Sequence, residues 1–338
     1  MIPEGGAGDA LPSGVTFIAQ AAMAYHFSKH IIPAAVIFMA VMQSCICEDL
    51  PPCGDDKVEI TIVNDWNGAP DAAPEGMAYE FYRAGLTSPW RFDFPGREAG
   101  RVALEEGEYR FVMYNDDTSD VIFEAGRDGL PFVTTACDMM GRDGHDTGLR
   151  KAPDMMWGCS AGMIGVSRDG LEYLPDGKSA GCNDRFILLT HPVQITPVYT
   201  VRVLRVANLS GVASMKGVIS GMASGVELYD EVRSDTAVGV TFSPEAVADS
   251  SLMARFCTFG PCGNGAGHEL RLYFLLSDQR LVSRSYDVTP DVASAKDPMH
   301  VEIVIDSISL PFSPPVIEGG AFDPEVVDWT TIIVNYGV

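Results

Sequence analysis

One serine of the chain lies in a pattern that hydrolases use for their nucleophile. Gly158-Cys159-Ser160-Ala161-Gly162 matches G-x-S-x-G, which places a serine on a sharp turn between a strand and a helix of a parallel sheet. The residues that follow, Met163 to Ser167, have the composition of a strand, and Gly165 would weaken a helix. We therefore interpret the motif as a glycine-rich turn and assign no catalytic residue.

A second group of side chains has the types that bind metal ions. Asp143, His145 and Asp146 lie in one Gly-rich segment, but their spacing differs from the D-x-[DN]-x-[DN]-G calcium loop. The 6 histidines are scattered, without a His/Cys pair at zinc spacing. The sequence therefore predicts a solvated loop here and no metal site.

The 8 cysteines offer thiol chemistry. Cys257 and Cys262 flank Gly260-Pro261, a spacing that could close a small disulfide loop in an oxidising compartment. A second set could be buried free thiols, or one bridge and one thiol: Cys137, Cys159 and Cys182. The remaining three lie near the N-terminus: Cys45, Cys47 and Cys53.

An apolar segment precedes the N-terminal cysteines. Residues 31–42 read IIPAAVIFMAVM, which is too short to span a bilayer as a helix and matches the hydrophobic part of a signal peptide. Lys29 supplies the positive charge before it, and Ser44-Cys45 follows it. This order resembles the lipobox of bacterial lipoproteins, with Met42 in place of the usual Leu. It predicts that Cys45 carries the lipid, and Cys47 is a weaker candidate.

The residues around this segment suggest how the N-terminus is processed. Residues 1–22 contain acidic side chains and no Lys or Arg, unlike the region before a signal peptide. We expect translation to start at Met23, so that 1–44 is a leader and 23–44 a signal peptide. Residues 45–56 read as a lipidated tether. Within it, Glu48-Asp49 resembles the surface-export signal of lipoproteins in the Bacteroidetes lineage.

The charge balance limits the partners of the chain. There are 46 acidic against 23 basic side chains, a net charge of −23. Such a surface repels phosphate backbones and anionic lipid, so it excludes nucleic acid as a partner. Membrane attachment then requires a covalent lipid or hydrophobic contact. The 34 Gly and 22 Pro favour a β-protein with frequent turns.

Alternating runs predict the strands of a first domain. Val58–Val63, Met77–Tyr82 and Tyr109–Tyr114 all follow a two-residue period. No window of twelve residues in this region shows the 3.6-residue stripe of an amphipathic helix. We expect a β-sandwich over residues 57–192.

A second domain follows a junction marked by Pro192 and Pro197. Its expected strands include Val198–Val206, His300–Ile308, a hairpin over Leu270–Tyr286 and a last strand at Thr330–Asn335. The Gly-containing stretch Ser210–Ser224 reads instead as turn-rich. We expect a β-sandwich over residues 193–338.

The tryptophans could stack on sugar rings, but packing in the core or between sheets explains them better. Each is next to apolar or turn residues typical of sandwich ends. They are Trp66, Trp90, Trp157 and Trp329.

Several segments resemble Bacteroidales lipoproteins of the fimbrial anchor and fimbrillin-like superfamily. These are turn and core signatures spread over most of residues 45–338. They include Asn64-Asp65-Trp66, Phe92–Gly96 (FDFPG), Tyr114–Thr118 (YNDDT), Ala152–Gly158 (APDMMWG) and the tail from Gly319 to Trp329.

The resemblance implies an all-β protein with two tandem transthyretin-like sandwiches after a lipoprotein signal peptide. It implies an outer-membrane location through the lipid on Cys45, no other cofactor, and assembly with fimbrial subunits by strand addition to sheet edges. The sequence shows no obvious arginine cleavage site of the type that shaft subunits use, which favours an anchor or assembly subunit.

Two other functions remain as alternatives to this non-enzymatic role. A surface glycan-binding lipoprotein would need exposed tryptophans in a row. A hydrolase would need clustered carboxylates or a Ser/His pair in one cleft.

Overall fold

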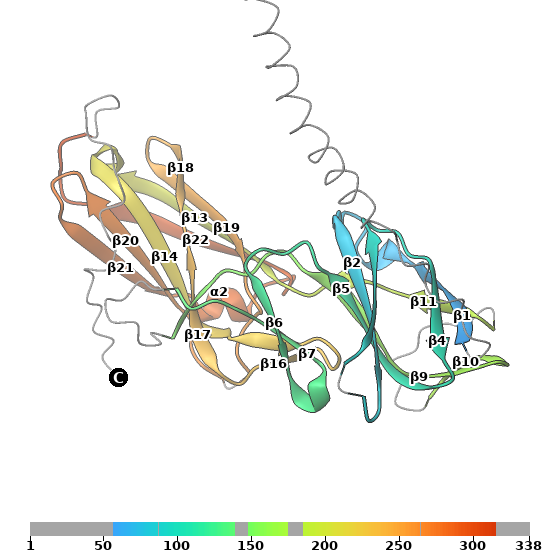
Figure 1. Ribbon diagram of the computed structural model, residues 1–338. Helices are drawn as coiled ribbons and strands as arrows, with labels where there is room; N and C mark the ends of the chain where they lie inside the picture. Colours follow the sequence, from blue (N-terminus) through green and yellow to red (C-terminus); the bar gives the residue numbers. More distant parts are fainter. Residues whose placement is uncertain (1–56, 87, 139–147, 175–184, 264, 316–338) are drawn as a thin grey trace, which may run out of the picture. The chain divides into compact units, whose positions relative to one another are not determined.

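The computed structural model describes residues 57–315, except 87, 139–147, 175–184 and 264 (Figure 1). Cys45, the leader, the tether and the expected strand Thr330–Asn335 lie outside the described residues. Among the residues that the structure does describe, no helix is long and apolar enough to cross a membrane.

Two sheets enclose the first hydrophobic core. Sheet A has the order β11 (Ile187–Thr190), β1 (Lys57–Asn64), β4 (Arg101–Glu105), with β11 parallel to β1. Sheet B has the order β10 (Gly170–Tyr173), β9 (Trp157–Ser167), β5 (Gly107–Asn115), β2 (Gly76–Arg83), β3 (Trp90–Pro95), and β12 (Val193–Gln194) also pairs with β9. The core between them includes Ile60, Tyr79, Phe81 and Phe111, each fully buried.

Two further sheets enclose a second core. Sheet D has the order β21 (Leu281–Asp287), β20 (Glu269–Leu276), β14 (Val212–Ala223), β17 (Ala237–Phe242), β8 (Leu149–Lys151). Sheet E has the order β18 (Glu245–Ala248), β19 (Ser251–Cys257), β13 (Val198–Ala207), β22 (His300–Ser309). The short helix α2 (Thr289–Ala293) buries Val292 in this core, which also includes Tyr199, Ile219, Leu270 and Ile303.

A small fifth sheet, sheet C, covers the outer face of sheet B. Its order is β16 (Val232–Arg233), β15 (Gly225–Glu227), β7 (Pro131–Thr135), β6 (Val121–Ala125). Val133 and Val226 of sheet C belong to one buried cluster with Ala78, Val112 and Tyr114 of sheet B. Both faces of the middle of sheet B are therefore buried.

These sheets confirm the expected all-β sandwich fold. The two-residue period of the sequence corresponds to the alternating burial of β13 and β22, and the expected hairpin is the antiparallel pair β20–β21. The boundary between residues 192 and 193 stays a prediction, and strands from both sides of it pair with each other, β7 with β15 and β8 with β17.

The turn-rich interpretation of Ser210–Ser224 is wrong, because β14 is a twelve-residue strand between β17 and β20. Its glycines serve close packing rather than turns. A Cβ at Gly217 would lie 2.2 Å from the Phe242 ring, so only glycine fits beneath that ring.

Candidate functional site

The longest edge strand among the described residues is β22, which has 10 residues. Within the described part of the chain its one strand partner is β13, and the parallel register runs from the pair Val198–His300 to the pair Ala207–Ser309. Val301, Ile303 and Ile305 point into the core. The far side of β22 therefore presents backbone N–H and C=O groups to which another strand can add.

The outer face beside this edge combines apolar side chains with paired charges. Val304 of β22 and Met253 of β19 lie on either side of Arg202 and are 49% and 42% exposed. Arg202 forms an ion pair with Glu302 at 3.0 Å, and Asp306 is likewise paired with an arginine of β13. A strand that approaches the edge would thus meet exposed apolar groups and carboxylates that already have partners.

Polar contacts fix both ends of β22. Arg284 Nη2 donates to the carbonyl of Ser309 at 2.9 Å, and Asn208 Nδ2 donates to the carbonyl of Leu310 at 2.7 Å. At the other end, the hydrogen bond with the His300 ring at 2.8 Å lowers the pKa of Asp297. Because the edge is already ordered, a partner strand would bind it at a smaller entropic cost.

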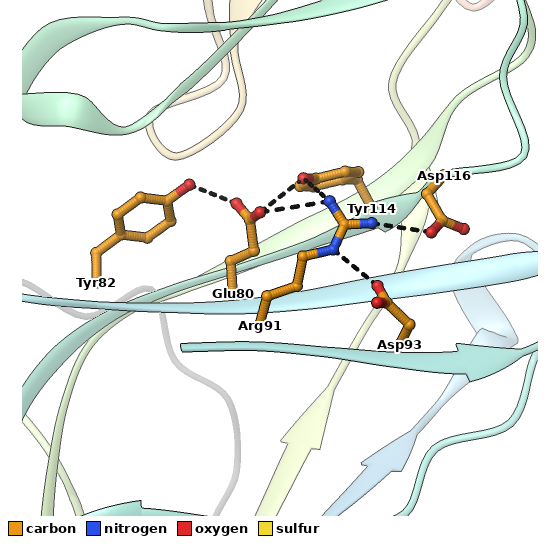
Figure 2. A network of polar contacts seen from close by, with 6 residues as sticks. All are labelled: Glu80, Tyr82, Arg91, Asp93, Tyr114 and Asp116. Carbon is orange, nitrogen blue, oxygen red and sulfur yellow. Dashed lines mark hydrogen bonds and ion pairs between the residues drawn. The ribbon is translucent and has the colours of Figure 1, made fainter. Parts of the chain in front are cut away.

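A buried carboxylate at the centre of a polar network is the other candidate. Glu80 of β2 is 6% exposed and lies on the face of sheet B that sheet C covers. Figure 2 shows its partners: the Tyr114 hydroxyl donates to Glu80 Oε1 at 2.9 Å, the Tyr82 hydroxyl donates to Oε2, and Arg91 Nη1 lies 3.7 Å from Oε1.

The outer part of this network uses the remaining donors of Arg91. Nε is 2.8 Å from Asp93 Oδ1, and Nη2 is 3.0 Å from Asp116 Oδ2. The ring of Tyr114 also stacks on Phe123 of β6, with centroids 4.6 Å apart. The network therefore joins β2, β3 and β5 beneath the edge strand of sheet C.

The arrangement favours a structural role over acid–base chemistry. Burial and the neighbouring Glu80 carboxylate raise the pKa of Tyr82 and of Tyr114 far above the usual range of tyrosine. Both hydroxyls therefore stay protonated at neutral pH, and both oxygens of Glu80 are already occupied. The two hydroxyls and Glu80 therefore hold one another in place between neighbouring strands.

The serine of the G-x-S-x-G pattern lies in strand β9 of an antiparallel sheet. The motif forms a bulge in that strand, at Gly162, whose φ is 70°. Ser160 is 8% exposed, and its Oγ accepts a hydrogen bond from the Gly162 N–H. The strand-turn-helix context of a nucleophile elbow is absent at these residues, and the glycine provides a bulge rather than the expected turn.

The two cysteines that could close a small disulfide loop, Cys257 and Cys262, are free thiols in the structure. Cys262 is buried, with Sγ 3.5 Å from the carbonyl oxygen of Ser234, and burial raises the pKa of Cys257. The bridge between them stays a prediction.

The described tryptophans pack against the first core, as expected. Trp66 is buried, and Trp90 and Trp157 are half-buried beside it. They form no exposed row. Trp329 lies outside the described residues.

The three candidate metal-binding side chains lie outside the described residues. Asp143, His145 and Asp146 fall in the undescribed segment 139–147. In the remainder of residues 57–315, no group of three His, Cys, Asp or Glu side chains could hold a metal ion.

Comparison with known proteins supports the fold. A family model described as Domain of unknown function (DUF5119) matches residues 44–243. A protein from Bacteroides ovatus described as "a putative adhesin" has 17% identity and a TM-score of 0.54, covering 76% of this chain and 94% of its own. No curated protein matches the sequence.

A second solved structure carries the name that the sequence resemblance suggested. The fimbrial anchor protein Mfa2 from Porphyromonas gingivalis has 13% identity, covers 74% of this chain and 89% of its own, and has a TM-score of 0.43. The comparison with the Bacteroides ovatus protein has the higher TM-score, and it confirms that the resemblance found in the sequence extends to the fold.

Proposed function

This chain belongs to the family described as Domain of unknown function (DUF5119), and from that premise we propose that it is a non-enzymatic, cell-surface adhesion protein that anchors or assembles a fimbria. In this proposal the lipid on Cys45 attaches the chain to the outer membrane. A strand of a fimbrial subunit adds to the side of β22 that faces away from β13.

The observation that carries the proposal is the ordered edge of β22, whose outer side pairs with no strand among the described residues. Ten residues of strand extend about 33 Å, which is long enough for a partner strand to form several backbone hydrogen bonds. The other edge strands among the described residues are shorter, from 2 residues in β16 to 7 in β21. The fold shared with the Bacteroides ovatus protein is consistent with this role.

The alternative of a glycan-binding lipoprotein receives less support. It requires a row of exposed tryptophans, and the three that the structure describes pack against the first core. In the Glu80 network both carboxylate oxygens accept tyrosine hydroxyls, an arrangement that suits a structural role.

Photo-crosslinking in intact cells tests the edge directly. We would place a photoreactive residue at Val304, next to the free edge of β22, and a control at Val247 on β18, the opposite edge of the same sheet, which is 55% exposed. We expect a crosslink to a fimbrial subunit from Val304 and none from Val247. Equal crosslinking from both sites, or none from either, would contradict the proposal.

A charge at the edge provides a functional test. Lysine on an edge strand discourages strand addition, so Val304→Lys should detach fimbriae from cells while Val247→Lys should not.

Palmitate labelling tests the lipid anchor, and it should be lost in Cys45→Ser and kept in Cys47→Ser. Firmly attached fimbriae in the Val304→Lys strain would count against β22, and labelling that persists in Cys45→Ser would count against the anchor.

A further inference from the structure

The core between sheets D and E is incompletely covered along β21, the edge strand of sheet D. Val282 and Tyr286 of β21 pack against this core but are only half-buried. Their partners across the ladder, Phe274 and Leu270 of β20, are at most 1% exposed. Because the members of a cross-strand pair lie on the same face of a sheet, the exposed parts of Val282 and Tyr286 lie on the side of β21 that faces away from β20.

The backbone of β21 has the same one-sided environment. Among the residues that the structure describes, this strand pairs with β20 alone, and its 7 side chains alternate between exposed and half-buried. The guanidinium of Arg284, on the core-facing side, already donates to the carbonyls of Ser283 and Ser309. A further strand with apolar side chains at alternate positions would therefore complete both the ladder and the cover of the core.

The last described residues of the chain are held at the start of β21. Ser313 is 2% exposed, and its hydroxyl lies 2.6 Å from that of Ser277, in the turn between β20 and β21. Ser277 also donates to the carbonyl of Pro314 at 2.6 Å. Arg280 Nη2 donates to the carbonyl of Phe312 at 2.7 Å. The chain therefore continues from a point beside this turn.

The residues that follow include a segment with the composition of a strand. Thr330–Asn335 reads TTIIVN and lies outside the described residues, and its first five residues are all β-branched. With a two-residue period, Ile332 and Val334 fall on the same face.

The length of the intervening chain allows this segment to reach β21. Thr330 is 15 residues beyond Pro315, so an extended chain between them covers at most about 50 Å. The 7 residues of β21 extend about 23 Å, and both ends of the strand are thus within reach. Such a short tether also keeps the segment near β21 at an effective concentration in the millimolar range.

We propose that Thr330–Asn335 adds to the side of β21 that faces away from β20, as a further strand of sheet D in the same chain. Ile332 and Val334 then point to the core and cover the half-buried pair of β21. The same segment would gain less apolar burial beside β22, whose core-facing side chains, Ile303 among them, are already at most 8% exposed. The proposal therefore leaves β22 to a partner strand and does not depend on it.

Hydrogen–deuterium exchange of the full chain, followed by mass spectrometry, tests this strand. We expect the backbone amides of residues 330–335 to exchange at least about a hundredfold more slowly than in a free peptide of the same sequence. Exchange as fast as in the peptide would overturn the proposal, because no strand would be present. Protection that is lost on dilution would also overturn it, because the strand would then come from a second copy of the chain.

Two double variants test which face of the segment points to the core. Ile332→Asp with Val334→Asp buries two charges, so it should abolish the protection of residues 330–335 and speed exchange in β21 by about tenfold. Thr331→Asp with Asn335→Asp is the matched control, with the same charges on the outer face, and should leave both unchanged. Exchange in β14 reports whether the rest of sheet D stays folded. Equal effects of the two double variants would overturn the proposal.

A photoreactive residue at Ser283, which is exposed in the middle of β21, tests the position without a change in the segment itself. In the purified protein it should crosslink to residues 330–335 of the same chain, whereas the photoreactive residue at Val304 of β22 should not. No capture from Ser283, or capture of residues 330–335 from Val304, would overturn the proposal. Capture of a fimbrial subunit from Val304 in cells is a separate result, so each proposal fails on its own measurement.

Discussion

Arg205 and Ser307 lie side by side on the parallel strands β13 and β22, and both have a left-handed backbone, with φ of 52° and 65°. The pairs on either side, Leu204–Asp306 and Val206–Ile308, keep the parallel register. The inward-facing positions of both strands shift by one residue at this point, so that Val206 and Ile308 enter the core. Two matched irregularities thus preserve both the pairing and the core.

A glycine at position 307 should stabilise the protein. A left-handed backbone costs a residue with a Cβ about 1–2 kcal/mol, so we expect Ser307→Gly to raise the free energy of unfolding by about 0.5–1 kcal/mol. Ser307→Val should lower it by about 1–2 kcal/mol, because β-branched residues avoid this conformation. Urea denaturation measures both. The control Ser309→Gly, in the same strand without a positive φ, should be destabilising; equal losses from the two glycines would refute the explanation.

Removal of the Glu80 carboxylate should be costly. Glu80→Ala leaves the hydroxyls of Tyr82 and Tyr114 without an acceptor in a buried position, so we expect a loss of about 2–4 kcal/mol in the free energy of unfolding. Chemical denaturation measures this loss. The matched control is Glu59→Ala, which breaks an exposed ion pair with Arg101 and should cost at most about 1 kcal/mol. Similar losses in the two variants would show that the Glu80 network stabilises the protein no more than a surface ion pair does.

The strands could be predicted from the sequence where one face of a sheet is solvated. The alternation of β13 and β22 is visible in the residues because their outer faces carry Arg202, Glu302 and Asp306. The prediction failed at β14, where Gly217 makes room for Phe242. The sequence alone does not distinguish a glycine that makes room for a side chain in a strand from a glycine that forms a turn, because the distinction depends on the neighbouring strand.

The Glu80 network could not be predicted, because it depends on a register and on a second layer. Alternation alone places Glu80 on a solvated face. In the structure Glu80 lies opposite Arg91 and sheet C buries that face. One signal was present: apart from Glu80, the run Met77–Tyr82 offers no charged residue on either face.

Alkaline pH should destabilise the protein through its buried tyrosines. Burial raises the pKa of Tyr79 to about 12 and that of Tyr199 to about 12, whereas an unfolded tyrosine ionises near pH ~10. The folded state binds these protons more tightly, so their stabilising effect is complete below pH ~10 and is lost as the pH rises through ~12.

The measurable consequence is the slope of stability against pH. Between those values, each tyrosine should lower the free energy of unfolding by up to about 1.4 kcal/mol per pH unit. Urea denaturation at a series of alkaline pH values gives the slope. Tyr199→Phe keeps the ring that stacks on Phe256 and should flatten the curve; an unchanged slope in this variant would disprove the assignment to Tyr199.

The thiols should differ in reactivity in the order of their exposure and protonation. Cys137 is exposed, whereas Cys262 is buried and burial raises the pKa of Cys257. Because the thiolate is the reactive form, alkylation by iodoacetamide at neutral pH should modify Cys137 first, at least about tenfold faster than Cys257. Peptide mass mapping over time measures each rate, and Cys137→Ser should remove the fast phase alone.

The buried thiol of Cys262 should react with iodoacetamide only in denaturant. If Cys257 and Cys262 form a disulfide in the native compartment, both will resist alkylation in denaturant until a reductant is added. A Cys257 that reacts as fast as Cys137 in the folded, reduced protein would contradict the protonation argument, because a half-buried, protonated thiol cannot match an exposed one.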